Sequence, residues 1–502
     1  MIRAVSPPAN SAVLATIAAT SKRTVSFEWH LARRVSIAPT YRLVNTIRKT
    51  GWATWLKAQI YSDSTFDTAA VETIIKKYYP WGFYDHTRYL TYTENWRFGG
   101  MNRNAAMLRR LYSEQHLRET MVEFWGDLIH VSSMGDAKAY ITQFDSRQRK
   151  NALGLFSTLL YESELTPAMI RMLTNHTNTV KAVNENMARE MLELHTVGVD
   201  GGFSEKDVQQ TALLLTGFNH NYDTSTFEFK PRNHYYGPLK IMGWSHRNSD
   251  TDNTLSVFKS FTNYLASHPA TAQRIAERLV ARFCSETQGP AGAALAASLA
   301  TTYLANKTDI KPVLWELFNS KHFKDSVGTK IARPGHIVAR NYAAMNTTFS
   351  PAAGAYNELL KLYSPPGRLD NHHIAMGHQF RGRSSPAGDP DEWQFWLSSN
   401  MVRTVTGALA LECATQSDPW FKAPDWATTL GLTTKMTVSQ LAETAYARIH
   451  GFFPDAAVKK AIEDSVSRFG TSGGIPSATA LEADRFGYTM HLILAAPHSF
   501  IR

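Results

Sequence analysis

The chain has 502 residues, of which 43% are hydrophobic and 19% charged, a composition typical of a folded globular protein. Its two cysteines, Cys284 and Cys413, exclude a disulfide framework and a cysteine-based structural zinc site, which leaves two buried thiols or one bridge as alternatives. No apolar run reaches about 18 residues, so the sequence predicts no transmembrane helix and favours a cytoplasmic protein.

The net charge of +10 is concentrated near the start of the chain. Residues 1–60 carry a net charge of +8, with Glu28 as the single acid and the basic residues Arg3, Lys22, Arg23, Arg33, Arg34, Arg42, Arg48, Lys49 and Lys57. Such a segment is either a solvated basic arm or a contact surface for an anionic polymer or surface. Nucleic acid is not favoured, because no RNP-type aromatic motif or zinc finger accompanies the charge. Residues 1–27 are predicted to be a flexible basic leader, too weakly apolar for a secretory signal.

Helical periodicity dominates the chain and strand alternation is scarce, so the predicted fold is mainly α: a large multi-helix globular protein with a few long irregular loops and at most a small hairpin. Helices are expected at 29–60 (two, broken at Pro39), 104–131, 148–162, 167–173, 184–197, from 204, at 270–285, 291–305, 310–319, 393–413, 438–450 and 455–468, and near the end of the chain. A loop or small hairpin is expected at 217–249 and a long irregular segment at 364–391. Residues 28–502 are predicted to form one domain, with sub-lobes near 28–260 and 261–502.

Three residues mark predicted helix ends. Pro167 suits the first turn of the helix that it begins. Gly198 suits the position just after the 184–197 helix. Ser204 and Asp207 have the spacing of a capping box at the start of the next helix.

The segment from Asn184 to Gly198 has the most specific pattern in the chain, Asn-Glu-Asn-Met-Ala-Arg-Glu-Met-Leu-Glu-Leu-His-Thr-Val-Gly. It resembles the signature of a bacterial family known as Domain of Unknown Function 1800. Supporting matches run from the His30–Arg34 motif through Lys330–Pro334 to Ala495–Phe500. The resemblance implies a predominantly helical fold and members that are often exported, and it brings no established chemistry.

The chain departs from this family at one position of interest. Relatives often carry histidines just after a Phe-Trp pair, which here is Phe124-Trp125. Gly126 and Leu128 stand where those histidines would fall. A metal or proton-transfer site at this point of the family is therefore expected to be lost or rearranged in this chain.

The 184–197 helix holds the main candidate catalytic residues. Glu190 and Glu193 are candidate acid/base or metal-binding carboxylates, with Arg189 as their electrostatic partner and His195 as a proton carrier or ligand. In a regular helix the side chains of Glu193 and His195 diverge by about 160°. The alternative is a salt-bridged helix, Glu185–Arg189–Glu193, with His195 as a hydrogen-bonded core histidine.

A second group of candidates lies outside that helix. His234, in a glycine-bearing loop, is a further candidate proton carrier. Tyr236 and Lys240 of the same loop, together with Asn184 and Asn186, are candidate substrate-binding residues.

Glu123, Asp127 and His130 are candidate metal ligands, because with Glu119 they share one face of the 104–131 helical segment. Carboxylates and a histidine at this spacing occur in the di-metal sites of helical bundles, which makes a divalent metal a candidate cofactor. The alternative is a solvated face opposite an apolar stripe.

The leading functional hypothesis is an enzyme with a polar cleft formed by the Asn184–His195 helix and the His234 loop, with a divalent metal as a candidate cofactor. No Gly-x-Ser-x-Gly elbow, P-loop, dinucleotide fingerprint or His-Glu-x-x-His motif occurs, which disfavours the corresponding enzyme classes. The alternative hypothesis is a non-catalytic binding or scaffold protein that engages an anionic partner through its basic N-terminal region. The sequence leaves open whether the protein is an enzyme.

Overall fold

The computed structural model describes residues 25–62, 69–78, 97–344, 348–349, 378–409, 421–422, 430–432, 436–468 and 483–502. The predicted mainly α fold is confirmed, since helices account for most of the described elements. Nearly all of the predicted leader, Cys413 and residues 364–377 of the predicted irregular segment lie outside the described residues. Cys284 is buried and carries a free thiol.

The first part of the chain is entirely helical where it is described. Its helices are α2 (Phe27–Val35), α3 (Tyr41–Thr50), α4 (Trp52–Tyr61), α5 (Ala69–Tyr78), α6 (Arg97–Tyr112), α7 (His116–Leu128), η3 (Gly135–Tyr140), α8 (Ile141–Asn151), α9 (Phe156–Glu164) and α10 (Pro167–Met172). Pro39 separates α2 from α3 as predicted, but three helices form instead of two, because Gly51 adopts a φ of +81° that ends α3 before α4 begins. Pro167 occupies the first turn of α10, as predicted.

The middle of the chain contains η4 (Asn175–Thr177), α11 (Asn186–Glu190), η5 (Met191–His195), α12 (Glu205–Leu214), η6 (Pro231–Asn233), α13 (Thr254–Ala266), α14 (Pro269–Phe283), α15 (Gly289–Ala305), α16 (Ile310–Asn319), α17 (Lys321–Asp325) and α18 (Pro334–Ala344). The single helix predicted at 184–197 is instead α11 followed by η5, a π-helical turn. Gly198 follows η5 with a φ of +88°. Ser204 and Asp207 form the predicted capping box of α12.

The strands are short and antiparallel. Residues 217–249 form two hairpins, β1 (Phe218–His220) with β2 (Phe227–Phe229) and β3 (Leu239–Ile241) with β4 (Trp244–His246). A further pair joins β5 (Thr348–Phe349) to β6 (Phe421–Lys422). The C-terminal part contains α21 (Trp393–Trp396), α22 (Ser399–Arg403), η7 (Thr404–Leu409), α25 (Val438–His450), α26 (Ala456–Arg468), α27 (Ala483–Leu494) and η8 (Pro497–Phe500).

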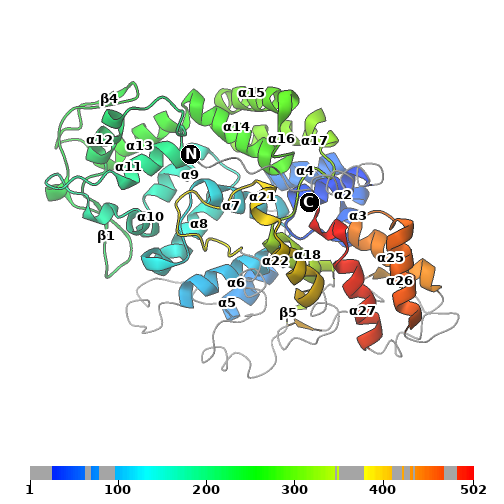
Figure 1. Cartoon of the computed structure of the whole chain (residues 1–502). Helices are drawn as coiled ribbons and strands as arrows, with labels where there is room; N and C mark the ends of the chain where they lie inside the picture. Colours follow the sequence, from blue (N-terminus) through cyan, green and yellow to red (C-terminus); the bar gives the residue numbers. More distant parts are fainter. Residues whose placement is uncertain are drawn as a thin grey trace.

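Buried apolar side chains form two clusters. The first extends in sequence from Trp29 to Phe323, and the second joins α6 and α18 to the C-terminal helices α25 and α27. Helices α13 to α16 contribute side chains to the first cluster, and the sub-lobe boundary near residue 260 stays a prediction. In Figure 1, α7 and α8 lie between the end that carries β1 and β4 and the end formed by α25 to α27.

Candidate functional site

The polar face of α7 is buried. Its candidate metal ligands Glu123, Asp127 and His130 are 1%, 5% and 1% exposed, and Glu119 is buried beside them. The solvated-face interpretation is therefore wrong. The face escaped prediction because the side chains that cover it come from elements far away in the sequence.

Arginines surround the carboxylate of Glu123. Its Oε1 atom accepts hydrogen bonds from His336 Nε2 at 2.8 Å, Arg333 Nη1 at 3.2 Å and Arg282 Nη1 at 3.3 Å. Its Oε2 atom lies 2.9 Å from Arg110 Nη2. Burial raises the pKa of Glu123, but His336, Arg110 and Arg333 outweigh burial and hold that pKa well below its usual range.

Asp127 and Asp391 complete this arrangement. Arg282 and Arg333 each donate to Asp127 Oδ2 and also to Asp391 Oδ1. Burial raises the pKa of Asp391, and Arg282 and Arg333 reverse the effect, so that its pKa lies below the usual value. We call the seven residues of this arrangement the α7 charge cluster: Arg110, Glu123, Asp127, Arg282, Arg333, His336 and Asp391.

In the α7 charge cluster, guanidinium groups occupy the positions beside the carboxylates that a bound metal ion would need. His130 is also engaged, since each of its ring nitrogens lies 3.1 Å from a carbonyl oxygen, of Gly126 or of Arg383. Within the described ranges, no group of three or more His, Cys, Asp or Glu side chains is arranged to hold a metal ion. The cluster therefore fits a structural ion-pair network between the two apolar cores.

The guanidinium of Arg381 lies beside Gly126. A Cβ atom at Gly126 would lie 3.2 Å from Arg381 Nη2 and 3.3 Å from its Cζ, so the guanidinium occupies the space beside this glycine. Arg381 donates to Gln148 Oε1 at 2.7 Å and to Asp145 Oδ1 at 3.3 Å. In this chain an arginine thus lies where a side chain at position 126 would project.

The start of the Asn184–His195 segment binds the protein's own chain. The side-chain amide of Asn184 donates to Thr174 Oγ1 at 3.0 Å, and that of Asn186 donates to the carbonyl of Leu173 at 3.1 Å. Both amides are therefore engaged in holding the loop before α11. Their expected role in substrate binding stays a prediction.

Arg189 belongs to a surface ion-pair network. It lies 3.5 Å from both Glu185 and Glu193, as the salt-bridged interpretation predicted, and it also donates to Glu205 at 2.7 Å. Glu190 is half-buried, and its pKa is raised by burial, against the opposing effect of His195. Burial thus favours the protonated form of Glu190.

His195 is a fully buried histidine whose partner was not predicted. Its Nδ1 atom lies 2.6 Å from Glu164 Oε1 at the end of α9, and neither side chain is exposed. The Nε2 atom of His195 and the Oε2 atom of Glu164 have no hydrogen-bond partner among the described residues. Arg274 donates to the carbonyl of Leu194 and thereby holds the end of the π turn.

The π turn changes which residues of this segment face one another. Glu190 and His195 are five positions apart, and an i→i+5 turn places such residues on one side, whereas a regular α-helix separates them. This geometry agrees with the electrostatic effect of His195 on Glu190. π turns of this kind occur often at functional sites.

His234 holds the hairpin region together. Its Nδ1 atom lies 2.7 Å from the carbonyl oxygen of Thr216, and its Nε2 atom lies 3.4 Å from Asn248 Oδ1. Tyr236 packs on its ring with a centroid separation of 4.8 Å, and Lys240 is exposed. In the described part of the chain no hydrogen bond or ion pair joins His234 to Glu190, Glu193 or His195, and the cleft between the two segments stays a prediction.

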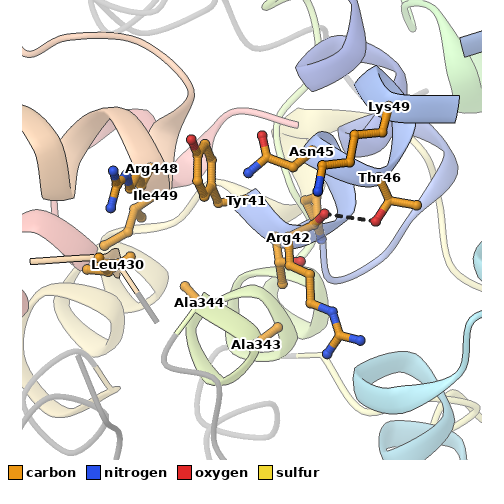
Figure 2. Close-up of a pocket in the computed structure, with 13 residues that line it drawn as sticks. Tyr41, Arg42, Asn45, Thr46, Lys49, Ala343, Ala344, Leu430, Arg448 and Ile449 are labelled. Carbon is orange, nitrogen blue, oxygen red and sulfur yellow. Dashed lines mark hydrogen bonds between the residues drawn. The ribbon is translucent and has the colours of Figure 1, made fainter. Parts of the chain in front are cut away.

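A cavity of about 580 Å³ lies between α3, α18 and α25. We call it the basic pocket; Figure 2 shows Arg42, Lys49 and Arg448 around it, with Tyr41, Asn45 and Thr46 beside them. Its lining residues are Pro39, Thr40, Tyr41, Arg42, Asn45, Thr46, Lys49, Ala343, Ala344, Leu430, Gly431, Arg448 and Ile449. A smaller cavity of about 240 Å³ adjoins it and shares Thr40, Arg42, Thr46 and Ala343.

Among the described residues, the lining of the basic pocket contains three cations and no carboxylate. Within the ranges that the structure describes, neither Arg42, Lys49 nor Arg448 forms an ion pair. Arg448 is held over the ring of Tyr41, with its Cζ atom 5.2 Å from the ring centre. Gly431 leaves room for that guanidinium, since a Cβ atom there would lie 2.5 Å from Arg448 Nη1.

The basic N-terminal region was predicted either as a solvated arm or as a contact surface, and its described residues divide between two environments. Arg33 and Arg34 are buried, and Arg33 donates to the carbonyl of His450. Arg42 and Lys49 are exposed at the basic pocket. The solvated-arm interpretation is therefore wrong for α2. Charge density alone does not distinguish these positions, because only the fold decides which face of a helix is covered.

These features define a mainly helical protein with a buried charge cluster between two cores and a basic pocket on its surface. The chain belongs to the family described as Protein of unknown function (DUF1800), whose family model matches residues 30–501. The resemblance found in the sequence is thereby confirmed. Searches among curated proteins and among solved structures returned no match. None of the helices in the described ranges is long and apolar enough to cross a membrane.

Proposed function

We propose that this protein binds a multiply anionic ligand in the basic pocket. The observation that carries the proposal is a cavity of about 580 Å³ that is lined, in the part of the chain that the structure describes, by Arg42, Lys49 and Arg448 and by no carboxylate. Unpaired cations around a concave surface focus a positive potential that attracts anions. A cavity of this size lies in the range of small-molecule sites.

The chemistry of the lining favours carboxylate or phosphate groups. Arg42 and Arg448 carry planar guanidinium forks, which bind such groups through two parallel hydrogen bonds. The hydroxyl groups of Thr46 and Tyr41 and the amide of Asn45 add neutral hydrogen-bonding groups. The ligand is either a small multivalent anion or the acidic group of a polymer. It is encountered in the cytoplasm if the localisation predicted from the sequence holds, and outside it if the protein is exported, as the resemblance implies.

Isothermal titration calorimetry with inorganic pyrophosphate tests the proposal, and a long polyphosphate chain in a parallel titration distinguishes a small ligand from a polymer. Arg448→Gln and Lys49→Met are each expected to weaken binding about tenfold, equivalent to about 1.4 kcal/mol, because each removes one charge from the pocket. The matched control is Arg48→Gln, since Arg48 lies on the same helix but faces Glu28 at 4.0 Å and does not line the pocket.

Arg48→Gln is expected to leave the affinity unchanged, and raising the salt concentration is expected to weaken wild-type binding. Equal losses in the pocket variants and in the Arg48 variant would show a diffuse charge effect and overturn the proposal. Absence of binding of both anions to the wild type would overturn it as well.

The enzyme hypothesis is retained as a second proposal, carried by the hydrogen bond between His195 and Glu164. A carboxylate that accepts from Nδ1 orients the imidazole ring so that Nε2 is the nitrogen left for proton transfer, and half-buried Glu190 supplies an acid on the same side of the π turn. We expect Glu164→Gln to lower turnover about 10²–10⁴-fold on whichever chromogenic ester, glycoside or phosphate the wild type hydrolyses. Glu185→Gln, on the surface near the same turn, is the control. The proposed role would be contradicted if the wild type and the Glu164 variant hydrolysed all three substrate classes equally fast. It would also be contradicted if neither protein hydrolysed any of them.

A further inference from the structure

Two buried histidines of the hairpin region differ sharply in their surroundings. Both ring nitrogens of His234 have polar partners, the carbonyl oxygen of Thr216 and the side chain of Asn248. His220, at the end of β1, has no exposed surface, yet neither of its ring nitrogens has a hydrogen-bond partner among the described residues. Burying an imidazole without partners is costly, so this arrangement requires an explanation.

A second histidine lies beside His220. The ring centres of His176 and His220 are 6.3 Å apart, with the ring planes at 75°. The Nδ1 atom of His176 is buried and also has no hydrogen-bond partner in the described part of the chain. Two neighbouring rings thus contain buried nitrogens that have no hydrogen-bond partner in the part of the chain that the structure describes.

Aromatic side chains cover the two histidines. Tyr222 packs on His220 with a centroid separation of 4.4 Å, and Tyr140 lies 5.3 Å from the same ring. Arg171 donates to the hydroxyl of Tyr222 at 2.9 Å and pairs with Asp136 at 3.0 Å. Tyr222 is 51% exposed, so it forms the outer wall of the site and the side from which an ion reaches His220.

We propose that His176 and His220 bind a single copper(I) ion. A metal ion lies about 2.0 Å from an imidazole nitrogen that binds it, so one ion can join two rings whose centres are 6.3 Å apart. This separation is close to the largest that one ion can span, which favours a two-coordinate, nearly linear arrangement. Imidazole nitrogen is a suitable ligand for copper.

The surroundings discriminate against divalent ions. Structural zinc requires four ligands, whereas no set of three or more His, Cys, Asp or Glu side chains converges here or elsewhere in the described residues. The charge of Arg171, only partly offset by Asp136, opposes cations at both histidines, and a monovalent ion is opposed less than a divalent one.

Anaerobic titration of the whole protein against a copper(I)-bicinchoninate complex measures the binding. We expect one copper(I) ion per chain in the wild type, and loss of this binding in His220→Leu and His176→Leu. His234→Asn is the matched control, because it also alters a buried histidine of the same region and leaves the proposed ligands in place. Circular dichroism of each variant identifies those that remain folded.

X-ray absorption at the copper edge needs no variant, so it keeps the proposal testable if the leucine variants unfold. It is expected to show two nitrogen neighbours about 2.0 Å from copper and no sulfur. Absence of stoichiometric copper binding in the wild type would overturn the proposal. Unchanged copper binding in folded His220→Leu, or loss of copper binding in folded His234→Asn, would also overturn the proposal. A copper site with more than two protein ligands would overturn it as well.

Discussion

Glu123 shows how a carboxylate is kept ionised inside a protein. Four side chains that contact it, Arg110, Arg282, Arg333 and His336, come from α6, α14, the segment before α18, and α18 itself. Removing a carboxylate from water is costly, and only several well-placed donors compensate for that cost. The charge of Glu123 is therefore maintained by the fold as a whole.

Glu123→Gln is expected to destabilise the protein by about 3–5 kcal/mol, because it leaves buried guanidinium groups without their counter-charge. Denaturant unfolding of both proteins at pH 7 measures the difference. Glu185→Gln, which removes one partner of a surface pair of α11, is expected to cost less than about 1 kcal/mol. Equal costs for the two variants would show that the α7 charge cluster does not stabilise the fold.

Features set by neighbouring residues were predictable at the scale of single elements. The capping box of Ser204 and Asp207, the position of Pro167 and the ion pairs of Glu185 and Glu193 with Arg189 all depend on residues within about four positions of one another. Periodicity was likewise sufficient for most helices, since an apolar stripe repeats wherever a helix packs on a core.

Contacts between distant elements were not predictable. Glu164 precedes His195 by 31 residues, and Arg333 follows Asp127 by 206 residues, so no local spacing reveals either pair. A helical wheel also fails at η5, because it assumes a regular α-helix, whereas the π turn places residues five apart on one side. The basic pocket depends on α3, α18 and α25 meeting, and the sequence pattern of α3 alone does not show this.

At the scale of the whole molecule, buried neutral histidines couple stability to pH. Burial lowers the pKa of His30 to about 3 and that of His498 to about 4, from about 6.5 in the unfolded chain. Because the folded-state pKa is the lower one, the unfolded chain binds more protons between these values. The stability contributed by each histidine is therefore complete above about pH 6.5 and is lost as the pH falls toward its folded-state pKa.

The free energy of unfolding is expected to fall between pH 6.5 and pH 4.5 by about 1.4 kcal/mol per pH unit for each such histidine. Denaturant unfolding at a series of pH values measures this slope. His30→Gln, which keeps a donor for the carbonyl of Phe323, is expected to reduce the slope by one histidine's share. An unchanged slope in that variant would contradict the burial effect at His30.

The distance along the chain between the two halves of the α7 charge cluster has a consequence for synthesis. Asp127 leaves the ribosome 206 residues before Arg333, a delay of about 10–40 s at translation rates of about 5–20 residues per second. During that time the nascent chain contains Arg110 but lacks Arg282 and Arg333, which contact the carboxylates of α7 in the complete fold. A polar face of this kind helps to keep the unfinished chain soluble, and it is buried only after α14 and the segment leading into α18 have been made.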